Sequence, residues 1–180
     1  MIPTTRMIPR LPCPVLSAAA ALGAVLATCP AGAQTKVPTV NCYDEVARPR
    51  PIYVAGSTAI RPFLGYASQL LAAEEDPYTI IYQSQGSCTG VDAIYSSDMG
   101  DQLIEDIPET PERSANYAIF FGADGETTQE CFLTPGGDLV DIGISDVFAS
   151  TCGYEGPPAG AEIRDFEGPI QPFVFNVPAA

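Results

Sequence analysis

The chain has 180 residues, with 8 Lys and Arg against 22 Asp and Glu, a formal net charge of −14 and no histidine. A chain this acidic lacks the basic surface that nucleic acids and anionic lipids require, so we expect it to bind neither. The absence of histidine removes the commonest general base and metal ligand, and with them every Ser-His-Asp or Cys-His catalytic arrangement. We therefore expect no enzymatic activity, no metal and no cofactor.

The first 33 residues are typical of an export signal. Two arginines precede the apolar run VLSAAAALGAVLA, and the small residues AGA end at Ala33 as a cleavage site. A less favoured alternative places a lipid on Cys29. No later stretch approaches the roughly 20 apolar residues of a membrane span. The mature protein is predicted to begin near Gln34 and to be periplasmic or secreted.

The exported part is long enough for one domain with a real core. Its four cysteines lie at intervals of 46, 43 and 21 residues, which include no C-x₂₋₄-C pair of the kind that binds zinc. In an exported chain this number predicts two disulfides, for which three pairings can be drawn. The four are Cys42, Cys88, Cys131 and Cys152.

A strand followed by a helix opens the domain. PIYVAG, residues 51–56, is rich in β-branched and aromatic residues and ends in glycine, which predicts a buried strand. Residues 57–75 are predicted to form a helix with Ser57 or Thr58 as its N-cap. Its predicted apolar face consists of Ile60, Phe63, Leu64, Leu70 and Leu71.

The next segments repeat this alternation and then depart from it. Residues 78–84 are predicted to form a second strand, and a second helix is predicted to begin within 89–97. Residues 98–115 are mostly polar and include two prolines, so they are predicted to be a surface excursion. Residues 116–134 are predicted to form a β-hairpin with an Asp-Gly turn, and 139–144 a further strand.

The predicted fold class is α/β. We expect a single three-layer lobe, residues 51–180, with a mainly parallel sheet flanked by helices and an inserted β-hairpin. Residues 34–50 are described only as an N-terminal extension. A last apolar run, Phe173 to Val177, lies near the end of the chain.

Three predicted strands end in loops of small or hydroxyl-bearing residues: AGST (55–58), QGSCTG (85–90) and ISD (144–146). The carboxyl ends of parallel strands lie on one edge of the sheet, so these loops should converge. Helices begin directly after the first two, and the free N–H groups of a helix start bind anions without a lysine or arginine. Cys88 and the other two late cysteines should lie near this edge, so Cys88 is predicted to bridge to one of them.

Each residue also has a simpler explanation. Ser57 and Thr58 are ordinary helix caps, Gly86 and Gly90 are ordinary turn residues, and a cysteine here is more often half of a disulfide than a nucleophile. The three loops together favour an anion site, in which Thr58 and Ser87 donate from their hydroxyls. Asp146 can face an anion only if one of the two carries a proton, as HPO₄²⁻ does and sulfate does not.

The motifs YVAGSTAIRPFL, IIYQSQGSCTGVDAI and DIGISDVF resemble, in this order, the first-lobe motifs of the phosphate-binding proteins of ABC importers, within the type 2 periplasmic binding-protein superfamily. The resemblance covers residues 52–95 and 139–148. It implies an exported protein that captures inorganic phosphate or a related oxyanion and delivers it to the membrane subunits of an importer.

The resemblance also implies which residues bind the ligand. The family's first hydroxyl donor falls on Thr58, with Ser57 and Ala59 as neighbours. Its second-loop serine falls on Ser87, between Gly86 and Cys88, and its aspartate falls on Asp146. The sequence departs from the family at Ser57, Cys88 and Thr89, which puts the identity of the anion in doubt.

In members of this family, a second lobe that carries an arginine closes over the ligand. Nothing after residue 148 resembles that motif, so we expect this to be an incomplete lobe or one whose missing wall a partner supplies. A second hypothesis is a secreted structural or interaction domain that reuses the lobe without transport. A third, a hydrolase with Ser57 or Ser87 as nucleophile and Asp146 assisting, is weakened by the lack of a histidine or nearby lysine.

Overall fold

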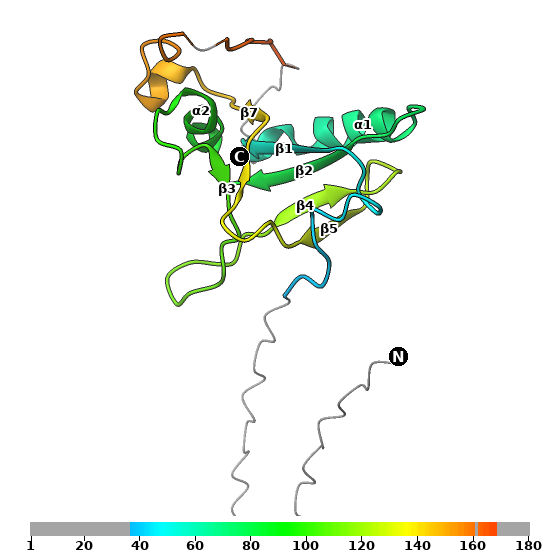
Figure 1. The fold of residues 1–180 in the computed structure, drawn as a ribbon. Coiled ribbons are helices and arrows are strands. Elements are labelled where there is room, and N and C mark those ends of the chain that lie inside the picture. Colours follow the sequence, from blue (N-terminus) through cyan, green and yellow to red (C-terminus); the bar gives the residue numbers. More distant parts are fainter. Residues whose placement is uncertain (1–36, 161, 169–180) are drawn as a thin grey trace, which may run out of the picture. The chain divides into compact units, whose positions relative to one another are not determined.

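A five-stranded sheet with the order β5-β4-β2-β1-β7 forms the centre of the fold (Figure 1). Its strands are β1 (Pro51–Gly56), β2 (Thr79–Ser84), β4 (Ala118–Phe121), β5 (Thr128–Cys131) and β7 (Ile142–Ile144). β1 runs parallel to both β2 and β7, whereas β4 is antiparallel to both β2 and β5. The α/β class is confirmed, but the sheet is mixed. The predicted hairpin is present as β4 and β5, and it extends the main sheet instead of standing apart from it.

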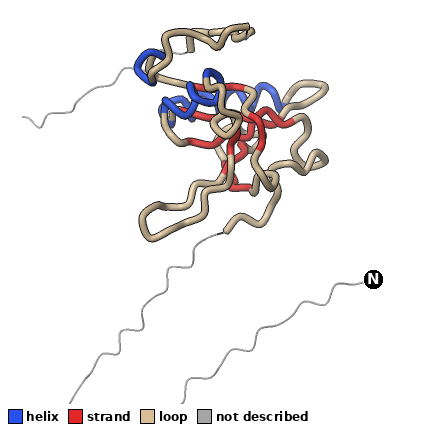
Figure 2. The backbone as a smooth tube through the Cα atoms, turned by 60° about the vertical axis from the view of Figure 1, so that its left-hand side comes forward, coloured by secondary structure: helices blue, strands red, loops and turns tan. Residues whose placement is uncertain are grey.

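This computed structural model describes residues 37–160 and 162–168, all of which belong to the unit Thr35–Ala180. The predicted export signal, Cys29 and the apolar run 173–177 lie outside the described residues. Figure 2 shows helices beside the strands, with loops making up much of the remaining backbone.

Helix α1 (Arg61–Ala72) follows a short 3₁₀ turn, η1 (Thr58–Ile60), and covers one face of the sheet. Leu64 packs with Val54, Ile80 and Tyr82 of the two central strands. Two residues of its predicted apolar face are instead exposed, Phe63 at 45% and Leu70 at 53%. Successive helical residues are 100° apart around the axis, and Phe63 and Leu70 lie about 100° from the residues that face the sheet. The predicted apolar face was therefore too wide.

The opposite face is covered by helix α2 (Ser87–Tyr95) and by the segment that precedes β1. Gly90 of α2 lies against Gly143 of β7, which pairs with Ala55 of β1. Cys42 is fully buried in the second core cluster with Ile81 and Ala55. The predicted N-terminal extension therefore contributes Cys42 to the core, with Val40 packed against it, whereas most of its other described residues are exposed.

The predicted strand 139–144 is divided in two. β6 (Asp138–Leu139) pairs with β3 (Leu103–Ile104) in a separate two-stranded sheet, and β7 joins the main sheet. Between them, the Asp141 carboxylate accepts a 2.8 Å hydrogen bond from the backbone N–H of Tyr53. Because a side-chain oxygen takes this position, the ladder between β1 and the strand begins only at Ile142.

The predicted surface excursion 98–115 is anchored at both ends (Figure 1). Ile104 is completely buried in the core. The Gln83 side chain, also completely buried, donates to the carbonyl of Glu105 at 2.7 Å and to that of Asn116 at 3.0 Å. Asn116 in turn donates from Nδ2 to the carbonyl of Ser84 at 2.5 Å.

Replacing Gln83 with Leu is expected to lower the free energy of unfolding by about 1–3 kcal/mol, because two carbonyls lose a buried donor that water cannot replace. Amide hydrogen exchange should quicken at Ile107, whose N–H donates to the Asn116 carbonyl at 3.1 Å. Gln129→Leu, on exposed β5, is the matched control. Unchanged exchange at Ile107 would show that the excursion does not depend on Gln83.

Candidate functional site

The three loops that the sequence singles out meet at the carboxyl ends of the parallel strands. Gly56, at the end of β1, is in register with Ser84 of β2 and with Ile144 of β7. The next backbone N–H, that of Ser57, donates to the Ile144 carbonyl at 2.9 Å. The loops after β1, β2 and β7 therefore begin at the same level of the sheet.

A side-chain contact joins the second and third loops. The Ser87 hydroxyl donates a hydrogen bond to Oδ1 of Asp146. Ser87 is the first residue of α2, which therefore begins earlier than the predicted 89–97, and Asp146 lies in the loop after β7. The contact brings together two residues 59 positions apart in the sequence.

Hydrogen bonds set the charge state of this carboxyl group. The pKa of Asp146 is lowered from its ordinary value, chiefly by the hydrogen bond from Ser87, with a smaller contribution from the Ser57 hydroxyl. Asp146 is exposed and is ionised at neutral pH. Its stabilising contribution is present above the ordinary pKa of an aspartate and is lost as the pH falls through the lowered pKa.

Ser57 caps the first turn after β1. It is only 3% exposed, and its Oγ accepts from the backbone N–H of Ala59 at 3.3 Å. The Ala59 N–H, a predicted ligand donor, therefore already has an acceptor. Beneath the turn, the Tyr82 hydroxyl donates to the Ser57 carbonyl at 2.7 Å, and burial raises the pKa of that phenol. Tyr82 holds Ser57 in place, which no sequence motif indicated.

The start of α2 is open. Gly86 stands at the N-cap position with φ 111° and ψ 167°, and no side chain caps the helix. The positive φ is one that glycine adopts readily. The first N–H groups of a helix lack intrahelical acceptors, and the helix dipole adds partial positive charge there. Backbone donors therefore lie in the same loop as the Ser87 hydroxyl.

A disulfide fixes this loop to the segment after β7. Cys88, in the first turn of α2, is bonded to Cys152 of η2 (Ala149–Cys152). The prediction that Cys88 bridges to one of the two later cysteines is confirmed. Cys131 is bonded instead to Cys42, in the core. Cys88 therefore holds α2 and the loop of Asp146 together and is not a free thiol.

Thr58 is exposed and borders a neighbouring groove, together with Arg61 of α1. The sequence reading did not assign Arg61 a role. The motif TAIRPF placed it in the first turn of the helix, but nothing showed which way it would point. Thr58 thus lies between the Ser57–Ser87–Asp146 cluster and this groove.

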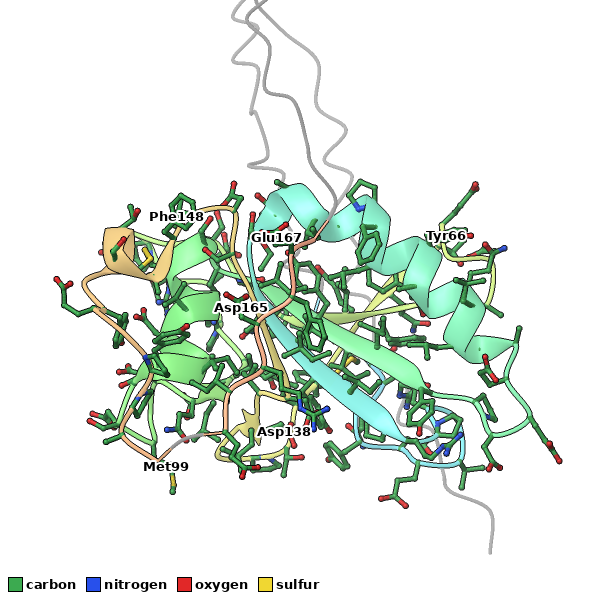
Figure 3. The ribbon with its side chains drawn as sticks, turned by 90° about the horizontal axis from the view of Figure 1, so that it is seen from above. Tyr66, Met99, Asp138, Phe148, Asp165 and Glu167 are labelled. Carbon is green, nitrogen blue, oxygen red and sulfur yellow. A yellow bond between two sulfur atoms is a disulfide. The ribbon has the colours of Figure 1, made fainter. Side chains whose placement is uncertain are left out.

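The surroundings are strongly acidic. Five arginines are the cationic side chains of the described residues, against the 22 acidic residues of the chain. Figure 3 shows Asp165 and Glu167 on the segment that passes the start of α1, and a Cβ added at Gly168 would lie 3.8 Å from Ile60. Exposed charges are screened beyond about 8 Å at physiological salt, so an anion here would depend on donors at contact distance.

The hydrolase hypothesis requires Asp146 to assist Ser87 as a base. Ser87 has a carboxylate partner, but the hydrogen bond that joins them lowers the pKa of Asp146. A carboxylate with a lowered pKa is a weak general base toward a serine hydroxyl.

The environment of the chain is indicated by its disulfides. Two are formed, Cys42–Cys131 and Cys88–Cys152, as an oxidising extracellular compartment allows. Within residues 37–160 and 162–168, no helix has the length and apolar character needed to cross a membrane.

Comparisons of this chain with protein-family models, with curated proteins and with solved structures gave no match.

Proposed function

We propose that the chain is an exported solute-binding lobe that captures inorganic phosphate or a related oxyanion for import by an ABC-type transporter. The observation that supports this most is the meeting of Ser57, Ser87 and Asp146 beside the uncapped start of α2. Hydroxyl and backbone N–H donors therefore lie next to one ionised carboxylate.

These groups match a protonated oxyanion. The Ser87 hydroxyl and the first-turn N–H groups of α2 donate to the anion's oxygens. On binding, Asp146 gives up the Ser87 hydrogen bond and accepts one from the anion's own O–H. Sulfate has no such proton and would place a charge against the carboxylate, so the site should discriminate against it.

The site as described is open to water, and a hydrogen bond exposed to water contributes less than a buried one. A second lobe or a partner chain would supply the remaining wall and raise the affinity. Membrane subunits of the importer would then receive the ligand. Neither metal nor catalysis is part of this proposal.

Phosphate titrated into phosphate-free protein is expected to give saturable heat in a calorimeter, whereas sulfate at the same concentration should give none. Ser87→Ala and Asp146→Asn should each weaken phosphate binding at least about tenfold, because each removes a charge-assisted hydrogen bond. Ser150→Ala, on η2, is the control and should bind normally. If phosphate gives no heat, or if both site variants bind like the unaltered protein, the proposal is wrong.

A second candidate, a secreted interaction domain, is favoured by one observation. Phe148, which Figure 3 labels, is 84% exposed, and its chain neighbour Val147 is 38% exposed. Adjacent exposed apolar side chains of this kind are typical of protein contacts. Absence of phosphate binding combined with capture of a partner that Phe148→Ser abolishes would support this function instead.

A further inference from the structure

A groove lies between the start of α1 and the turn that joins β4 to β5. It has a volume of about 500 Å³, the size of a site for a small organic molecule. It contains one cationic side chain, one carboxylate and two apolar side chains. Its lining consists of Thr58, Arg61, Pro62, Phe121, Gly125, Glu126 and Thr128.

Arg61 supplies the positive charge. Its Nη2 donates to Oγ1 of Thr128 at 3.1 Å, which is its one side-chain hydrogen bond within residues 37–160 and 162–168. The ion pairs found there join other arginines, Arg48 to Asp44 and Arg50 to Asp76. A guanidinium has five N–H donors, so most of those of Arg61 remain for a ligand.

Glu126 supplies the negative charge from the opposite wall. Its carboxylate takes part in no hydrogen bond or ion pair of the described residues, including none with Arg61 within 4.0 Å. The neighbouring Asp124 is already engaged, because its oxygens accept from Thr127 N at 2.9 Å and from Thr127 Oγ1 at 2.8 Å. These bonds lower the pKa of Asp124, and Glu126 is the acidic residue among those that line the groove.

The two walls are held at a fixed spacing. A Cβ built on Gly65 of α1 would overlap the Gly125 carbonyl, and one built on Gly125 would lie 3.0 Å from the carbonyl carbon of Gly65. Gly125 also has φ +70°, which glycine adopts readily. The backbone of α1 and the backbone of the β4–β5 turn are thus in contact below the groove. Phe121, which is 6% exposed, lies next to this contact. The groove is preformed.

We infer that this groove binds a small zwitterion of the α-amino acid type with an apolar side chain. The ligand's carboxylate contacts Arg61 and the hydroxyls of Thr58 or Thr128, its ammonium contacts Glu126, and its side chain lies on Phe121 and Pro62. A ligand with only a negative charge would be repelled by Glu126, and a ligand with only a positive charge would be repelled by Arg61. A zwitterion pairs both charges and covers the apolar surface between them.

The test uses L-leucine as the probe and backbone amide NMR as the readout. Leucine is expected to shift resonances of residues 58–65 and 121–128 in a saturable manner. Arg61→Gln and Glu126→Gln should each weaken binding at least about fivefold, since each removes one charge-assisted contact. Arg113→Gln, an exposed arginine of the excursion, is the matched control and should bind leucine like the unaltered protein.

Leucinamide and N-acetyl-leucine separate the two charges of the ligand. Each lacks one charge, so each should bind at least about fivefold more weakly than leucine. The inference is wrong if leucine shifts no resonance of the groove, if both variants keep full affinity, or if both derivatives bind as well as leucine. The phosphate proposal is tested separately, because Ser87→Ala should weaken phosphate binding at least about tenfold and leave the leucine shifts intact.

Discussion

Gly90→Ala is expected to lower the free energy of unfolding by about 3 kcal/mol, because the added methyl group has no space. A Cβ at this position would overlap the Ile144 carbonyl oxygen, and it would lie 2.8 Å from the Ile144 nitrogen and 2.9 Å from the Ala55 carbonyl oxygen. All three atoms are backbone, so no side-chain rotation relieves the contact. α2 must move away from β1 and β7.

Thermal unfolding should measure this effect, with the midpoint falling by roughly 10 °C. Gly156→Ala is the matched control, since a Cβ there meets nothing within 4 Å. At an uncrowded position in a helix, Gly→Ala stabilises the protein by up to about 1 kcal/mol. A loss of stability would therefore show that Gly90 is packed against the neighbouring backbone. A midpoint equal to or above that of the unaltered protein would contradict the close packing of α2 on β7.

Removal of the Cys42–Cys131 disulfide is expected to have a still larger effect. The bond spans 89 residues, and a loop of that length corresponds to roughly 4–5 kcal/mol of unfolded-state entropy. Both cysteines are 0% exposed, so the Cys42→Ala/Cys131→Ala protein also loses sulfur packing in the core. Urea titration should show a domain that is largely unfolded at 37 °C.

The other disulfide provides the matched comparison. Cys88–Cys152 spans 64 residues, which gives nearly the same entropic contribution, but Cys88 is exposed. Cys88→Ala/Cys152→Ala should therefore be more stable than the first double variant by about 1–2 kcal/mol. Reduction with a thiol should open this exposed bond first. If the core pair were reduced first, the assigned difference in burial would be wrong.

The order of the main elements followed from local patterns. Residues 51–56 and 79–84 form strands because each contains an unbroken run of β-branched and aromatic residues, 52–54 and 79–82. Ser57 caps the 3₁₀ turn η1, and helix α1 begins directly after it, with a proline in its first turn. These signals act over a few residues, so they can be read without knowing the rest of the fold.

The candidate site was predictable to the same extent. Parallel strands joined by helices must end on a common edge, and this predicted that the loops of Thr58, Ser87 and Asp146 converge. In the structure, Ser57 and not Thr58 is the first-loop residue that interacts with Asp146 in this cluster. That Ser87 donates to Asp146 could not be predicted, because it depends on where α2 begins. Its start at Ser87 follows from the backbone turn at Gly86 and the tether at Cys88.

Composition and spacing determined the class, the first three elements of the predicted lobe and the edge at which small and hydroxyl residues gather. Contacts between distant segments decided the rest. Asp141 interrupts a strand by bonding Tyr53, 88 residues away, and Arg61 gains its role only because the β4–β5 turn lies beside it. Local propensity is a property of neighbours in the chain, whereas pairing, pockets and disulfides depend on which distant residues the packed backbone brings together.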